Sequence, residues 1–433
     1  MSISSSLNAG VMGLAANASR LASISDNIAN SATIGYKQSE VDFSAMVLNQ
    51  GQTGYSAGGV SSRSYKNVDA EGALINTGNS TDIAVDGRGM LPVTDSNGVT
   101  ASASARTLML TPTGSFTPND QGFMSTLSGL YLMGWPADAS GNIPSVSRNS
   151  AVGLQPVNVA ANQFVASPTT NINLGVNLPS SATEAGAAGS PFDLPVEYFN
   201  SLGSSETLTL SFSPTVPGAG ASNAWTVSVN DSANPGAPVA SFTIDFNTGL
   251  TNGGTVGTVT GGAGAAYDAA TGEITINAAH GPVSLYVGTA GSRDGLTQLD
   301  AAFSPTSVTK NGSPISELQS IEIDDKGMLE AVYESGLRRT LYQIPVADVP
   351  NMNGLKSQGD QAYSLSRDSG EVYFWDSGTG AVGTTQGFTL MESTTDIAAE
   401  LTDLIETQRA YSTNAKIVQT VDEMLQETTN LKR

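Results

Sequence analysis

The 433-residue sequence contains no cysteine and only one histidine, His280. Disulfides, thiolate nucleophiles and cysteine-ligated zinc are therefore excluded. A single histidine cannot form a histidine metal cluster, and the surrounding Ala279-His280-Gly281-Pro282 shows no partner pattern for a Ser-His-Asp triad. We expect no catalytic residue, no metal and no cofactor, and we interpret His280 as a solvated turn residue.

Charged residues are scarce and mostly acidic. They make up 13% of the chain, against roughly 25% in an ordinary soluble domain. The 18 Lys and Arg against 39 Asp and Glu give a formal net charge of −21. Such a chain is poorly suited to binding nucleic acid or an anionic membrane. Together with 47 glycines and abundant Ser and Thr, this composition is typical of β-rich extracellular or fibre-forming proteins. A β-sandwich enzyme or binding protein with long loops remains the alternative.

Long hydrophobic runs are also missing. No run approaches the roughly 18 apolar residues that a membrane-spanning helix needs, so we expect no membrane insertion. The first residues carry neither a basic segment nor a continuous apolar core, so they do not form a Sec signal peptide. If the protein is extracellular, we expect it to be exported by another route.

Each end of the chain carries apolar residues at alternating steps of three and four, the spacing of one helix face. We predict helices within residues 1–30 and 397–433. A narrow apolar stripe needs a partner, so we predict that these stripes form subunit interfaces. Polar gaps at Ser25, Gln408 and Asp422 argue against the alternative, an antiparallel hairpin that closes a monomer. The stripe residues are Leu7, Val11, Leu14, Leu21, Ile28, Ile397, Leu401, Leu404, Tyr411, Val418 and Leu425.

The residues between the two ends have a β-type pattern, with apolar side chains at every second position. We predict a mainly β fold with terminal α-helices and a nested multidomain order. A helical, coiled-coil-like core (1–30 plus 397–433) leads through an extended connector (31–71 plus 360–396) to a first β-domain (72–149 plus 311–359). A second β-domain (150–310) is inserted in the first. Alternating strands are predicted around Leu208–Phe212, Trp225–Val229, Phe242–Phe246, Ile274–Ile276 and Leu285–Val287.

Turn residues divide these strands. Asp95-Ser96-Asn97-Gly98 and Asp324-Asp325-Lys326-Gly327 both predict turns, and residues 251–266 predict a loop. Asp324 and Asp325 lack the alternating ligand spacing of a calcium loop, so we favour the turn over a cation site.

Three segments resemble the family of bacterial flagellar rod and hook proteins. The first contains Asn27, Ile28, Ala29, Asn30, Gly35, Tyr36 and Lys37. The second is Thr77–Gly87, and the third runs from Ala399 to Lys416 and contains Gln408, Arg409, Ala410 and Tyr411. The large insertion at 150–310 resembles the hook members of the family, because the rod members are much shorter. Residues 387–396 depart from the usual family pattern, which affects the packing expected there.

The resemblance implies a structural subunit of the hook, not an enzyme. Such subunits assemble with copies of themselves into a curved, flexible tube that links rod to filament and transmits torque as a universal joint. It also implies an extracellular location after flagellar type III export. The implied partners are the distal rod protein, the hook cap, the hook–filament junction protein and the export apparatus. The alternatives are a distal rod protein with an insertion and a secreted β-rich adhesin or surface-layer subunit.

Overall fold

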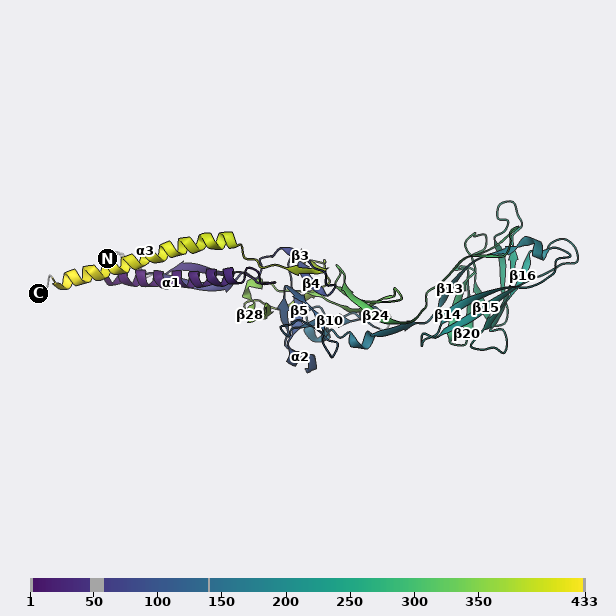
Figure 1. The fold of residues 1–433 in the computed structure, drawn as a ribbon, viewed down its shortest axis with the longest axis horizontal. Coiled ribbons are helices and arrows are strands. Elements are labelled where there is room, and N and C mark those ends of the chain that lie inside the picture. Colours follow the sequence, from purple (N-terminus) through teal and green to yellow (C-terminus); the bar gives the residue numbers. More distant parts are fainter. Residues whose placement is uncertain (1–2, 47–57, 139–140, 431–433) are drawn as a thin grey trace. The chain divides into compact units, whose positions relative to one another are not determined.

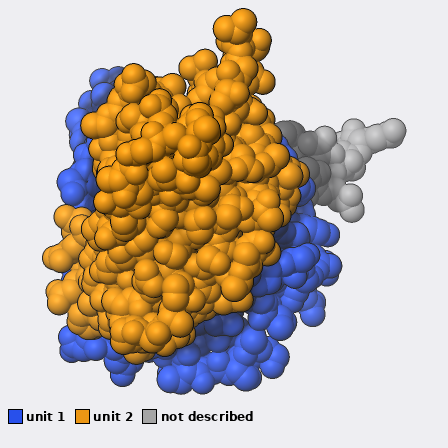
Figure 2. Space-filling model, turned by 90° about the vertical axis from the view of Figure 1, so that its right-hand side faces the viewer, with its two compact units in different colours: residues 1–161, 320–332, 338–433 blue, residues 162–319, 333–337 orange. Residues whose placement is uncertain are grey.

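The computed structural model describes residues 3–46, 58–138 and 141–430. The fold is mainly β, with two long terminal helices (Figure 1). The chain forms two compact units, coloured separately in Figure 2: unit 1 comprises residues 1–161, 320–332 and 338–433, and unit 2 comprises residues 162–319 and 333–337. The sequence of unit 2 is thus inserted in that of unit 1. The finer four-part division stays a prediction.

The predicted terminal helices are confirmed as α1 (Ile3–Ala29) and α3 (Ile397–Asn430). The remaining residues of the predicted ranges at the two extreme ends, 1–2 and 431–433, lie outside the described residues. The two helices lie side by side and run antiparallel (Figure 1). Asp396 caps α3, because its carboxylate accepts the amides of Ala398 and Ala399 at 2.8 and 3.3 Å.

A two-stranded hairpin follows α1 and packs along it. Its strands are β1 (Ser39–Ala45) and β2 (Val60–Lys66), which pair antiparallel from Ser39↔Lys66 to Ala45↔Val60. Both strands contact α1, so the hairpin and the helical pair belong to the same unit.

The β-body of unit 1 is built from strands on both sides of the insertion. Its largest sheet runs in the order β25-β26-β10-β5-β6-β29-β28, with β24 (Ser313–Ile323) beside β25. Large buried side chains such as Met90, Trp135 and Phe374 form its core. The strands are β3 (Leu74–Asn76), β4 (Asp82–Asp86), β5 (Leu91–Thr94), β6 (Met109–Thr111), β7 (Thr113–Ser115), β8 (Thr117–Pro118), β9 (Met124–Ser125), β10 (Tyr131–Pro136), β11 (Gln155–Pro156), β25 (Met328–Tyr333), β26 (Arg338–Gln343), β27 (Val346–Asp348), β28 (Lys356–Gly359), β29 (Ala362–Ser364), β30 (Tyr373–Trp375), β31 (Thr384–Gly387) and β32 (Thr389–Met391).

Unit 2 contains two sheets that share one core. The first has the order β14-β15-β16-β17-β18; the second has the order β19-β20-β21-β13-β22, with β23 paired to β13. β12 pairs with the first part of β24. The strands are β12 (Phe164–Ser167), β13 (Asn171–Pro179), β14 (Phe192–Phe199), β15 (Ser205–Pro214), β16 (Ala224–Asp231), β17 (Ala240–Phe246), β18 (Val256–Gly261), β19 (Ala265–Asp268), β20 (Glu273–Ala278), β21 (Gly281–Tyr286), β22 (Leu296–Leu299), β23 (Ser304–Lys310) and β24 (Ser313–Ile323).

Short helical segments connect several of these strands. They are α2 (Ser96–Thr100) and the 3-10 turns η1 (Ala151–Gly153), η2 (Ala160–Asn162), η3 (Ser180–Thr183) and η4 (Met352–Gly354).

The five alternating strands predicted in the middle of the chain are confirmed. Every second side chain in them is buried, including Leu208, Phe212, Trp225, Phe242 and Ile274. The alternation of apolar residues predicted these strands correctly because one face of each sheet packs on the shared core.

Two local predictions were wrong and two were confirmed. Residues 95–98 do not form a simple turn: Asp95 caps the short helix α2, accepting the Gly98 amide at 2.8 Å. Residues 251–266 are not one loop, because β18 runs through them and buries Val256 in the core. The turn at 324–327 is confirmed, with the Gly327 amide donating to the Asp324 carbonyl at 3.1 Å. His280 is confirmed as an exposed residue in the turn between β20 and β21.

Candidate assembly interface and its anchoring junction

The seam between α1 and α3 is lined by small residues of α1. A Cβ added at Gly13 would lie 2.9 Å from Nδ2 of Asn414, and one added at Gly10 would lie 3.2 Å from Val418. Ala16, one turn further, is buried. The helices can approach closely because α1 presents almost no side-chain volume at these positions.

The face that α3 turns toward this seam is largely polar. Its buried residues are Glu400, Thr407 and Val421, which lie seven and fourteen residues apart and so share one face. Beside the seam, Arg20 and Asp403 form an ion pair at 3.1 Å. The contact inside one chain therefore uses few large apolar side chains of α3.

Several residues of the predicted α3 stripe lie away from this face. Ile397 and Leu401 are each 48% exposed and Tyr411 is 43% exposed. Leu401 follows the buried Glu400 by one residue, which turns it about 100° around the helix. The stripe thus runs mainly beside the seam, although its Val418 enters the seam opposite Gly10.

The other predicted stripe residues divide in the same way. Val11 and Leu425 are exposed, whereas Leu7, Leu14, Leu21, Ile28, Leu404 and Val418 are half-buried. Sequence reasoning left out three further exposed apolar residues of α3, Ile405, Ile417 and Met424. They lie off the alternating series of steps that starts at Ile397, so that series gave no signal for them.

The first motif segment forms a junction at the base of the helical pair. Asn27 is buried, and its amide nitrogen donates to the Ser39 carbonyl at 2.9 Å and to Glu400 Oε1 at 2.7 Å. Its carbonyl oxygen accepts the Ser39 amide at 2.8 Å and the Tyr36 hydroxyl at 3.1 Å. One side chain therefore links the end of α1, the start of β1 and the first turn of α3.

Glu400 is the partner that sequence reasoning did not single out. It is 4% exposed, and its Oε1 also accepts Gln38 Nε2 at 2.7 Å. A carboxylate in the first helical turn is favoured by the helix dipole, which was the only local signal. Its role depends on Asn27, which lies 373 positions earlier in the chain.

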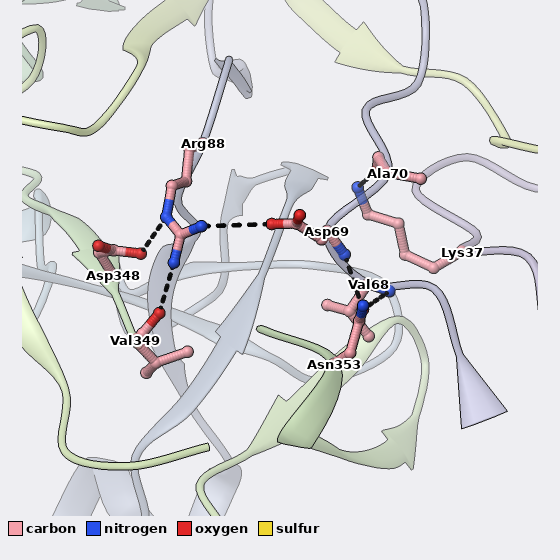
Figure 3. Close-up of polar contacts among 8 residues, drawn as sticks. All are labelled: Lys37, Val68, Asp69, Ala70, Arg88, Asp348, Val349 and Asn353. Carbon is pink, nitrogen blue, oxygen red and sulfur yellow. Dashed lines mark hydrogen bonds and ion pairs between the residues drawn. The ribbon is translucent and has the colours of Figure 1, made fainter. Parts of the chain in front are cut away.

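Gly35, Tyr36 and Lys37 continue the junction toward the β-body. Gly35 adopts a φ of 71°, and a Cβ there would lie 2.9 Å from Thr113. Burial raises the pKa of Tyr36 to about 12. Lys37 is buried, donates to the Ala70 carbonyl (Figure 3) and lies 3.6 Å from the Met391 sulfur. Burial lowers the pKa of Lys37 to about 8.

The segment after β2 is hydrogen-bonded to residues that follow the insertion in the sequence. Figure 3 shows Arg88 between Asp348, Val349 and Asp69, with Nε donating to Asp348 at 2.8 Å and Nη2 to the Val349 carbonyl at 2.7 Å. Nearby, Asn353 Oδ1 accepts the amides of Val68 and Asp69 at 2.7 and 3.1 Å. These contacts join residues 68–88 to residues 348–353, which lie before and after the insertion in the sequence.

Known proteins match the C-terminal segment and the whole length of this chain. The family model described as "Flagellar basal body rod FlgEFG protein C-terminal" matches residues 386–431, which include the end of β31, β32 and all of α3. The flagellar hook protein FlgE of Brucella suis is 32% identical over 435 residues, covering all of both chains. This chain belongs to the flagellar hook protein family. The flagellar hook protein FlgE of Rhizobium meliloti is also 32% identical over the full length of both chains, and that of Escherichia coli is 29% identical over 98% of each.

The two terminal motifs of this hook protein family member are used differently within the chain. The first makes the junction: Asn30, for example, bonds Asp26 at 2.9 and 3.0 Å, while Ile28 is half-buried and Ala29 exposed. In the C-terminal motif, Gln408, Arg409 and Tyr411 are exposed and Ala410 is half-buried. The structure does not bring these four residues to the junction.

Two further findings concern the described residues of this family member. They contain no helix long and apolar enough to cross a membrane. Nor do these same residues contain a group of three or more His, Cys, Asp or Glu side chains that could hold a metal ion.

Proposed function

We propose that this chain is a structural subunit of the bacterial flagellar hook and that it assembles with copies of itself through the exposed face of its helical pair. The observation that carries the proposal is the position of the α3 stripe. Ile397, Leu401 and Tyr411 stay exposed although α1 packs along α3. The seam uses mainly another face of α3, whose buried residues are Glu400, Thr407 and Val421.

The energetics favour contact with other copies. Burying a large apolar side chain contributes roughly 1.5–3 kcal/mol. Several such side chains per copy give an association free energy that repeats along a polymer. A wall of neighbouring helical pairs also tolerates the polar gaps at Gln408 and Asp422 better than a two-helix contact does.

In this proposal the polymer is a curved tube that connects rod to filament outside the cell and transmits torque as a universal joint. The chain is not an enzyme. Its partners are its own copies, the distal rod protein, the hook cap, the hook–filament junction protein and the flagellar type III export apparatus. Family membership favours this role over a rod protein with an insertion or a secreted adhesin.

Electron microscopy of the purified full-length chain under polymerising salt conditions tests the proposal. We expect curved tubes from the full chain and only monomers from a chain lacking residues 1–30 and 397–433. Straight tubes would favour a rod protein. Failure of the full chain to assemble, even with seeds, would overturn assembly through the termini.

A further inference from the structure

A cationic cleft lies in unit 1 between β2 and the segment around η4. It has a volume of about 540 Å³, and its lining includes Arg63, Lys66 and Lys356 but only one carboxylate residue, Asp368. These three residues are a notable share of the 18 cations in a chain of net charge −21. The cleft therefore carries the opposite sign to the chain as a whole.

Its cations are not neutralised by ion pairs. Among the described residues, none of Arg63, Lys66 and Lys356 lies within ion-pair distance of a carboxylate, although Asp42 faces Arg63 across the β1–β2 ladder. The Lys66 ammonium lies 4.3 Å from the centre of the Tyr36 ring. By contrast, Arg20, Arg88, Arg148, Lys310 and Arg338 all have carboxylate partners.

The walls of the cleft are held in place. Asn353 Oδ1 accepts hydrogen bonds from the amides of Val68 and Asp69, and these bonds join the segment after β2 to η4 (Figure 3). On the other wall, the Ser366 hydroxyl donates to the Gly354 carbonyl at 2.6 Å. A positively charged cleft with fixed walls is suited to binding a negatively charged surface.

Unit 2 has the complementary charge. Its residues include twelve Asp and Glu but only two cations, Arg293 and Lys310, which gives a net charge of −10. Lys310 is already paired with Glu197 at 2.6 Å. Most of these carboxylates are exposed, among them Asp193, Asp245 and Asp268. Copies of unit 2 repel one another electrostatically unless positively charged groups neutralise their surfaces.

We infer that the cleft formed by Arg63, Lys66 and Lys356 docks an exposed acidic surface of unit 2 from a second copy of this chain. This inference rests on the proposed self-assembly and adds a partner surface for it. This electrostatic contact would fix how two copies align, and it is separate from the apolar stripe of α3.

Zero-length carbodiimide coupling tests the contact, because it joins an amine only to a carboxylate that touches it. Polymers are assembled from equal amounts of isotopically light and heavy full-length chain, coupled, and analysed by mass spectrometry. We expect mixed light–heavy links from Lys66 or Lys356 to a carboxylate within 162–319 or 333–337. Absence of such links, or links only to carboxylates of unit 1, would overturn the inference.

A matched pair of variants provides a second measurement. Lys356→Glu and Lys326→Glu make the same charge change at exposed lysines of unit 1, but only Lys356 lines the cleft. We expect Lys356→Glu to raise the critical concentration for polymerisation at least tenfold above that of Lys326→Glu. Equal critical concentrations would overturn the inference. If the unmodified chain does not polymerise in this assay, the proposed function fails instead.

Discussion

The helical pair of unit 1 and the two-sheet core of unit 2 use apolar residues in opposite ways. Unit 2 buries its largest side chains, such as Trp225, Phe212 and Phe242, within a single chain. The helical pair places glycine and polar groups in its seam and leaves Leu401 and Tyr411 exposed. Unit 2 thus buries its large apolar side chains within its own chain, whereas the helical pair leaves several of its own exposed.

Truncation in the core of unit 2 gives the largest expected effect. Phe212 is fully buried, so Phe212→Ala should lower the free energy of unfolding of unit 2 by about 3–5 kcal/mol. Hydrogen exchange of the β15 and β16 amides measures this locally. Phe164→Ala is the matched control, because Phe164 is an exposed phenylalanine of the same unit, and we expect a change below about 0.5 kcal/mol. Similar losses for the two variants would contradict the account of the core.

The buried Lys37 should make the stability of unit 1 depend on pH. The pKa of Lys37 falls from 10.5 to about 8 in the folded chain, so the unfolded chain binds more protons between these values. Stability should therefore rise with pH in this window, by roughly 2–3 kcal/mol. Above about pH 10 the raised pKa of Tyr36 opposes the rise, since its ionisation is then favoured by unfolding.

Denaturation of unit 1 at pH 8, 9 and 10 measures this rise. Lys37→Met keeps the buried stem but removes the ammonium, and should flatten the profile. A rise of unchanged size in Lys37→Met would show that another group is responsible.

The buried carboxylate of Glu400 gives an intermediate effect. Glu400→Ala leaves the donor groups of Asn27 and Gln38 without their acceptor, which should destabilise unit 1 by about 1–3 kcal/mol. Glu400→Gln keeps an acceptor oxygen and should lose less. Chemical denaturation followed by far-ultraviolet circular dichroism checks the order. Equal loss in the two variants would contradict a hydrogen-bonding role.

The smallest effect on the free chain is expected at the exposed stripe. Leu401→Gln replaces one good helix former by another at a half-exposed position, so the stability of the monomer should change by less than about 0.5 kcal/mol. Thermal denaturation of the monomer at low salt measures it. A loss above about 1.5 kcal/mol would mean that Leu401 supports the fold of its own chain.

The sequence carried enough signal for the terminal helices and for the alternating strands of unit 2. Both depend on local periodicity, as at Leu208, Leu210 and Phe212. The face that α3 presents to α1 could not be predicted, because the large residues suggested one face and the close approach at Gly13 selects another. The Asn27–Glu400 bond was equally out of reach, since no local pattern pairs residues 373 positions apart. The strand β18, which begins at Val256, was not predicted because the glycines around it are typical of a loop.

The central claim is that the exposed stripe of α3 serves assembly and not the fold of the single chain. Pelleting of polymer from the double variant Leu401→Gln/Tyr411→Gln, beside Glu406→Gln as an exposed control on α3, tests this most directly. We expect the double variant to remain a folded monomer at concentrations where the control polymerises fully, with a critical concentration raised at least a hundredfold. Polymerisation of the double variant at the control's concentration would contradict the claim.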